Sequence, residues 1–114
     1  MSRAKRSPCP VACALDVIGD KWTLLVIRDL ASGRSHFKDF SRSPERIATN
    51  ILTDRLGRLV AEGLVERYPT DEQPGRDAYR LTAKGQTLGP VLKAIARWGL
   101  ANIKGTAALV GPKL

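Results

Sequence analysis

The segment from Ile47 to Glu62 constrains the fold of this chain more than any other part of the sequence. Its apolar residues recur at helical spacing and form one face, with Ile47 and Ile51 at the margin. That apolar face consists of Leu52, Leu56, Leu59 and Val60. The other side carries polar residues, which are Asn50, Thr53, Asp54 and Arg58. Short hydrogen-bonding side chains of this kind suit the reading of base edges in the major groove of DNA.

The segments on either side of this helix predict the rest of the fold. A short helix at 36–41, capped by Ser35, and a turn at 42–46 come before it, and Gly63 ends it. Two strand-like pieces, 64–68 and 77–81, follow around a loop with two prolines and a glycine. This order predicts an α+β, mostly helical fold: a winged helix-turn-helix with a β-hairpin wing and N- and C-terminal dimerisation helices.

Three further helices are expected around this unit. Pro10 favours the start of the first, and Asp20 can cap a central buried helix from 21 to about 31. Thr82 is expected to cap one long C-terminal helix, which Pro90 should kink. We expect the first and last helices to pair two copies of the chain through Val11, Leu15, Leu88, Val91, Leu92, Ile95 and Trp98. The alternative is that the C-terminal stripe only covers its own domain.

A chain of 114 residues, 43% of them hydrophobic, fits one domain with a modest core. We expect a basic flexible arm at 1–8, a winged-helix DNA-binding and dimerisation domain at 9–104 and a flexible tail at 105–114. Residues 7–10 stand where a signal peptide would have its apolar core, and no apolar run reaches the length of a membrane span. A cytoplasmic protein with reduced thiols is therefore expected.

The formal net charge of +8 makes polyanions the natural partners, nucleic acid first and an anionic membrane second. Two cysteines and one histidine cannot form a four-ligand zinc site of Cys and His within one chain. No Ser-His-Asp set, metal-binding pair or phosphate-cradling glycine loop is evident in the sequence. We therefore expect double-stranded DNA as the partner, no membrane association, no enzyme activity and no metal or cofactor.

The DNA contacts are expected from the first half of the helix at 47–62. Thr49, Asn50 and Thr53 would enter the major groove, where an asparagine can pair with adenine. Arg46 and Arg58 flank them and would hold the phosphate backbone.

Other charged residues leave two interpretations open. Arg55 lies nearer the inner face, so a DNA contact and an ion pair that holds the fold are equally expected. Asp54 either accepts from a cytosine or pairs with an arginine. Arg76 near the wing tip could enter the minor groove, or it could belong to a solvated loop.

Cys9 precedes Pro10 at an expected helix N-terminus, where backbone amides and the helix dipole stabilise a thiolate. It is either a reactive thiol or a small packing residue. Cys13 follows four residues later, a spacing poorly suited to an unstrained disulfide within one helix, so a bridge between subunits is the better alternative.

Several motifs, taken in order, resemble the HxlR-type winged-helix regulators. The segment 9–30 is similar to their N-terminal signature, and Phe37–Phe40 to the first helix of their helix-turn-helix. The segments 47–65 and 79–85 resemble their recognition helix and the end of their wing, and 88–92 with 98–99 their dimerisation helix. The resemblance implies a bacterial or archaeal homodimeric transcription regulator, related in plan to MarR-type proteins. It also implies a sensor role for Cys9, because some members use the matching cysteine to detect electrophiles or oxidants.

Together these features predict a sequence-specific regulator, a repressor, that binds a pseudo-palindromic operator as a homodimer. A small molecule or an oxidant acting on Cys9 is the expected input. Two alternatives stay open. A nucleoid-like protein would share the basic charge without reading bases, and a protein-interaction module would use the winged helix only as a scaffold.

Overall fold

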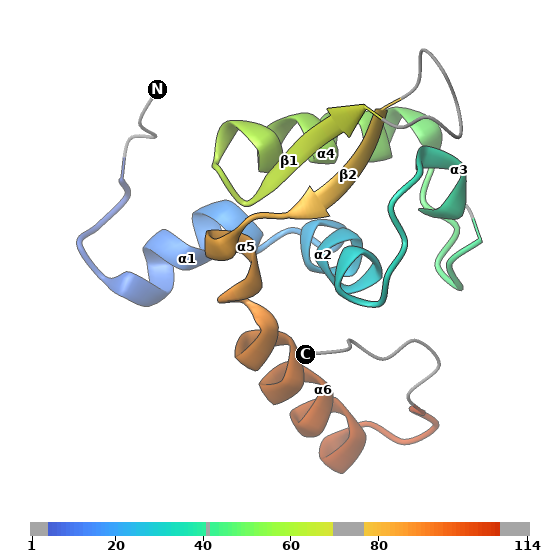
Figure 1. Cartoon of the computed structure of the whole chain (residues 1–114). Coiled ribbons are helices and arrows are strands. Elements are labelled where there is room, and N and C mark those ends of the chain that lie inside the picture. The colour runs from blue at the N-terminus through green and yellow to red at the C-terminus, as the bar shows by residue number, and fades with distance from the viewer. Residues whose placement is uncertain (1–4, 41, 70–76, 108–114) are drawn as a thin grey trace.

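The computed structural model describes residues 5–40, 42–69 and 77–107 (Figure 1). Helices predominate and a single β-hairpin lies between them, which confirms the α+β, winged helix-turn-helix prediction. The elements in chain order are α1 (Pro10–Ile18), α2 (Thr23–Ala31), α3 (Phe37–Phe40), α4 (Thr49–Ala61), β1 (Val65–Pro69), β2 (Asp77–Leu81), α5 (Ala83–Gln86) and α6 (Gly89–Asn102).

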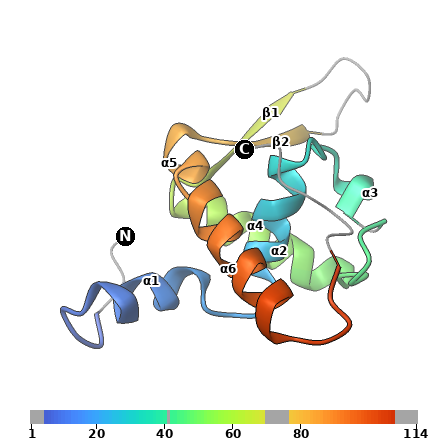
Figure 2. The same ribbon diagram turned by 90° about the horizontal axis from the view of Figure 1, so that it is seen from below.

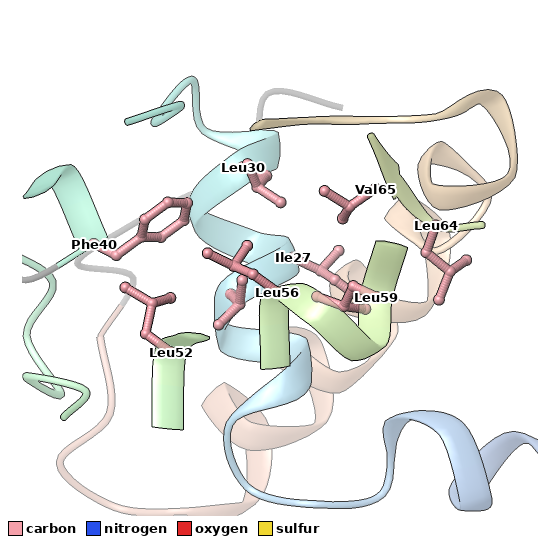
Figure 3. Packing of buried hydrophobic residues seen from close by; sticks show 9 residues of the cluster. Ile27, Leu30, Phe40, Leu52, Leu56, Leu59, Leu64 and Val65 are labelled. Carbon is pink, nitrogen blue, oxygen red and sulfur yellow. The ribbon is translucent and has the colours of Figure 1, made fainter. Parts of the chain in front are cut away.

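The core forms where α2 and α4 pack against each other and against the start of β1 (Figure 3). The central helix is buried as predicted, and Ile27 within it is fully covered. The inner face of α4 contributes Leu52, Leu56 and Leu59, while Phe40 of α3 closes one end of the cluster. Burial of these side chains orients α4 and leaves its polar face in solvent.

The hairpin is antiparallel and pairs Val65 with Leu81 at one end and Pro69 with Asp77 at the other. On its second side β2 meets the segment before α3, since the Tyr79 amide donates to the Ser35 carbonyl at 2.8 Å. The wing is thereby attached to the helix-turn-helix unit at the start of α3.

Three sequence predictions about helix ends are wrong. The side chain that accepts from the backbone at the start of α3 is Asp39, whereas the Ser35 hydroxyl contacts the His36 ring. Helix α2 begins at Thr23 rather than at residue 21, although Asp20 does accept from the Trp22 and Thr23 amides.

The third correction concerns the C-terminal helix, which is two helices. Thr82 caps only the short α5, by accepting from the Gly85 amide. Pro90 does not kink a long helix, because it stands in the first turn of α6, where a proline loses no hydrogen bond.

The outer helices project from the core. Helix α1 lies to one side and buries none of its residues, and α6 buries only Gly89 (Figure 2). Within the described part of the chain, no helix has both the length and the apolar character needed to cross a membrane. Much of the expected arm and tail, at 1–4 and 108–114, falls outside the described residues.

Candidate nucleic-acid interface

The outer face of α4, defined here as Thr49, Asn50, Thr53, Asp54, Gly57 and Arg58, is exposed along the whole helix. Thr53 donates its hydroxyl to the Thr49 carbonyl at 2.9 Å, so the oxygen of that hydroxyl faces outward as an acceptor. Ala48 at the N-cap makes no side-chain cap, which leaves the first amides of α4 directed at solvent. The predicted groove-entering residues therefore share one accessible surface.

Two arginines lie just before this face. Arg46 adopts a left-handed backbone conformation with φ of 51°, which turns the chain into α4. Arg42 and Arg46 line an open hollow of about 520 Å³ together with Ser43, Pro44 and Ile47. A concave surface with two guanidinium groups beside a helix N-terminus suits a phosphate group.

Arg58 extends from the outer face, half exposed, with its Nη1 atom 3.6 Å from Asp54. Of the two alternatives for Asp54, pairing with arginine is the one found here, and Arg55 is its second partner. These contacts partly neutralise Asp54, the one carboxylate of the outer face.

Arg55 faces the domain, with a side chain that is only 19% exposed. Its Nε–H donates to Oδ2 of Asp20 at 2.7 Å. The sequence left two roles open for Arg55, a DNA contact and an ion pair that holds the fold. The contact with Asp20 corresponds to the ion pair. The pair connects α4 to the carboxylate that accepts from the backbone amides at the start of α2.

The environment of Asp20 favours its charged form. Burial alone would raise the pKa of this carboxyl, but hydrogen bonds from the Thr23 hydroxyl and the Arg55 guanidinium lower it. The Trp22 amide and the positive charge of Arg55 act in the same direction, so the pKa lies well below its ordinary value. Conversely, the hydrogen bond to Asp20 is the main cause that raises the pKa of Arg55.

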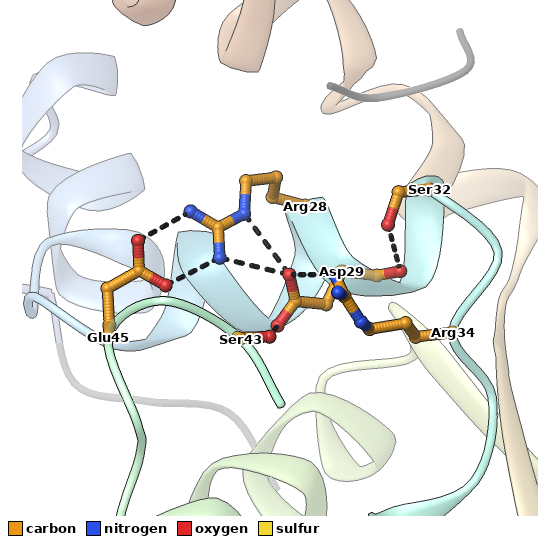
Figure 4. A network of polar contacts seen from close by, with 6 residues as sticks. All are labelled: Arg28, Asp29, Ser32, Arg34, Ser43 and Glu45. Carbon is orange, nitrogen blue, oxygen red and sulfur yellow. Dashed lines mark hydrogen bonds and ion pairs between the residues drawn. The ribbon is translucent and has the colours of Figure 1, made fainter. Parts of the chain in front are cut away.

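A polar network that sequence reasoning missed fixes the turn before α4 (Figure 4). Asp29, 3% exposed within α2, accepts from the Ser43 hydroxyl and from Arg28 Nη2 at 3.0 Å. Arg28 in turn donates to both oxygens of Glu45, at 2.9 and 2.7 Å. The turn is thus held to α2 from both ends, since Ser43 and Glu45 lie in it and Arg28 and Asp29 in the helix.

These contacts shift the pKa values of Arg28 and Glu45, the pair at the solvent side of the network. The hydrogen bond to Glu45 is the main cause that raises the pKa of Arg28, and the same contact lowers the pKa of Glu45. A signal was present in the sequence: Arg28 and Asp29 interrupt a helix that is apolar nearly all round. A buried aspartate in such a helix requires partners, although the sequence could not name them.

The described part of the wing carries cations that are already paired. Arg80 contacts Glu66 at 2.7 Å and lies over the Tyr68 ring at 4.5 Å from its centroid. Arg67 Nε is 3.9 Å from Asp77. Arg76, the predicted minor-groove contact, lies outside the described residues.

Cys9 is exposed at the N-cap of α1, which does not fit a packing role within the protomer. Its amide donates to the Ser7 hydroxyl at 3.2 Å, while the Cys13 thiol donates to the Ser7 carbonyl at 3.2 Å. Both thiols are free. Arg6, which lies close to Cys9 in sequence, contacts Asp16 at 2.6 Å.

The residues predicted to pair two copies divide into two groups. Large apolar side chains on α1 and α6 are strongly exposed, among them Val11 at 66% and Trp98 at 64%. Leu15 and Ile95 are exposed as well, and Val91 is half-buried. In contrast, Leu88 and Leu92 are partly buried against the core of their own domain, and their place in an interface between two copies stays a prediction.

Comparison with known proteins relates this geometry to one family. Residues 17–107 match the family model described as HxlR-like helix-turn-helix. The chain is 36% identical over 94 residues to the uncharacterised HTH-type transcriptional regulator YybR of Bacillus subtilis, covering 82% of this chain and 75% of that protein.

Two solved structures are similar over most of their length. The redox regulator HypR in its oxidised form superposes with a TM-score of 0.74 at 36% identity, covering 82% of this chain and 97% of that chain. The reduced form of the transcriptional regulator YodB from B. subtilis superposes with a TM-score of 0.70 at 28% identity, covering 89% and 100%.

Proposed function

The chain belongs to the HxlR-like helix-turn-helix family of DNA-binding transcriptional regulators, which are not enzymes, and on this premise we propose that it represses transcription as a homodimer on a pseudo-palindromic operator. The single observation that carries the proposal is the outer face of α4, a polar, accessible surface on a helix whose other side is fixed in the core. Asn50 and Thr53 would read bases there, with Thr49 at the helix start.

Positive charges around this face supply the affinity that does not depend on sequence. Arg42 and Arg46 before α4, and Arg58 along it, would hold phosphates on either side of the groove. Arg55 is left out of this set, because Asp20 and Asp54 already bind it. Arg76 remains a candidate contact from the wing.

The homodimer is supported by apolar surface that the protomer leaves uncovered on α1 and α6. Val11 and Leu15 on α1, and Ile95 and Trp98 on α6, would be buried between two copies. Pairing through these helices would place two recognition helices for successive major grooves on one side of the duplex.

Cys9 would be the point at which an oxidant or electrophile acts. The thiol is exposed and free on a helix of the proposed dimer interface, so its modification would change how two copies pair. A regulator described as redox-responsive is among the similar structures. Cys13, half-buried and hydrogen-bonded to Ser7, is the second thiol to test.

The proposal is tested by selecting bound sequences from a random duplex pool at physiological salt, with and without a thiol oxidant. Enrichment of a two-fold-symmetric motif is expected, with a preference of about 10³-fold or more over random DNA. Loss of the motif under oxidant in the parent and in Cys13→Ser, but not in Cys9→Ser, would support the sensor role of Cys9.

Two other results would contradict the proposal. Binding without enrichment would favour a nucleoid-like protein that holds DNA by charge alone. Absence of salt-dependent DNA binding would favour an interaction module built on the winged helix.

A further inference from the structure

We propose that Gly57 allows the floor of the DNA major groove to approach the backbone of α4, so that the recognition helix lies deeper than it could with a side chain at this position. The inference rests on the function proposed above. It adds a positioning residue that acts through the absence of a side chain.

Among the described residues, no contact and no backbone conformation explains a glycine at position 57. Glycine is the least favourable residue after proline in a helix interior, and Gly57 lies in the middle of α4. A Cβ atom there would meet nothing within 4 Å, and the backbone has no positive φ. Gly85 and Gly63 differ, because the first packs against the Leu64 carbonyl and the second has φ of 76°.

The position of Gly57 relates it to the DNA-binding surface. It lies one helical turn beyond Thr53 and Asp54, and all three are exposed on the outer face of α4. Arg58 extends beside it. Gly57 is therefore a gap near the C-terminal end of the outer face, whose other side chains are placed for the proposed contacts with bases and phosphates.

The charges around this gap permit a close approach. The carboxylate of Asp54 would repel phosphates if it stood alone next to Gly57. Its Oδ2 atom instead contacts both Arg55 and Arg58, so its charge is compensated on the protein side. A duplex that approaches Gly57 thus meets helix backbone, flanked by a paired carboxylate and a cation.

A methyl group at this position should affect folding and binding in opposite directions. Alanine favours the helix, so the folded protein becomes more stable. At an interface packed as tightly as a protein interior, the same methyl group separates the two surfaces and weakens the complex. A surface position without a role in binding would show the first effect without the second.

The experiment compares Gly57→Ala, Gly57→Leu and Gln86→Ala with the parent. Gln86 is an exposed helical residue of α5, outside both the outer face of α4 and the proposed pairing surface. Melting temperature is measured by circular dichroism, dimerisation by sedimentation, and affinity by titration of the duplex selected by the parent. Gly57→Ala should melt a few degrees higher than the parent, whereas Gln86→Ala should melt close to it.

The affinity for the selected duplex distinguishes the variants. Gly57→Ala should bind the selected duplex about tenfold more weakly, and Gly57→Leu weaker still, while Gln86→Ala binds as the parent does. Unchanged affinity of Gly57→Ala, or an equal loss in both alanine variants, would overturn the role of Gly57 and leave the proposed function intact. If the parent itself selects no duplex, the proposed function fails, and the role of Gly57 fails with it.

Discussion

The guanidinium of Arg55 in the recognition helix donates to the carboxylate of Asp20 at 2.7 Å, across 35 positions of sequence. The same carboxylate accepts from the first amides of the turn into α2. One side chain therefore contacts both the start of the central helix and α4, and its ion pair with Arg55 forms only while the carboxyl is ionised.

This arrangement makes stability depend on pH below neutrality. The pKa of Asp20 is lowered by folding, so its contribution is fully present above the unfolded pKa near 3.9 and is lost as pH falls through the lower, folded value. The gap in unfolding free energy between parent and Asp20→Asn should be largest near neutral pH and narrow from about pH 5 downward. Urea unfolding at several pH values measures it. Asp77→Asn, in an exposed pair with Arg67, is the control and should give a small gap throughout.

Loss of Asp29 should weaken the fold far more than loss of its exposed neighbour in the network. Asp29→Ala leaves the Ser43 hydroxyl and the Arg28 guanidinium without their buried acceptor, at an expected cost of about 3 kcal/mol. Glu45→Gln, at the solvent end of the network, should cost about 1 kcal/mol or less. Urea unfolding compares them, and equal losses would mean that the network does not depend on Asp29.

Gly85 permits a close contact between α5 and the turn after α4. A Cβ atom at this position would stand 2.0 Å from the Leu64 carbonyl oxygen, and that oxygen also accepts from the Thr82 amide. Gly85→Ala should therefore destabilise the protein by about 1–3 kcal/mol, despite the higher helix propensity of alanine. Thermal unfolding tests this, and a rise in melting temperature would contradict the close packing.

Substitution by glutamate should have different effects at the exposed and at the core-packed apolar residues of α6. Trp98→Glu is expected to yield a folded monomer, because Trp98 is exposed and contributes to the proposed pairing surface. Leu92→Glu should instead reduce stability, since Leu92 packs against its own core. Sedimentation and thermal unfolding distinguish these outcomes. A dimeric Trp98→Glu protein would place the interface elsewhere.

Base reading and phosphate binding should be separable along α4. Asn50→Ala should relax base preference and cost about 1–3 kcal/mol on the selected duplex. Arg58→Ala should weaken binding to all sequences alike and flatten its salt dependence. If both variants bound every duplex as well as the parent does, α4 would not be the reading helix.

Elements with strong periodicity were predictable from the sequence. Spacing and composition predict the apolar face of α4, its end at Gly63 and the central position of α2. They do so because burial of a periodic apolar face directly stabilises the fold. Helix ends were harder to predict. Thr82 does cap a helix, but that helix stops after one turn, where Gly85 packs on Leu64 and Pro90 then starts α6.

Contacts between distant residues could not be predicted. The pairs of Asp20 with Arg55 and of Arg28 with Glu45 join separate elements, and nothing in local spacing identifies the partner of a charged residue. The same limit applies to Leu88 and Leu92. Their helical stripe predicts a buried face, but whether that face is covered by the same chain or by a second copy depends on how α6 folds back.

The attachment of the wing also governs which edges of the protein can recruit another strand. Strand β2 is paired with β1 along one side, and on the other side its middle is occupied by residues 35 and 36. The outer edge of β1 is short, carries Glu66 and Arg67, and ends at Pro69, all of which discourage strand addition. The hairpin thus offers little edge to another strand, which leaves the exposed apolar side chains of α1 and α6 as the proposed pairing surface.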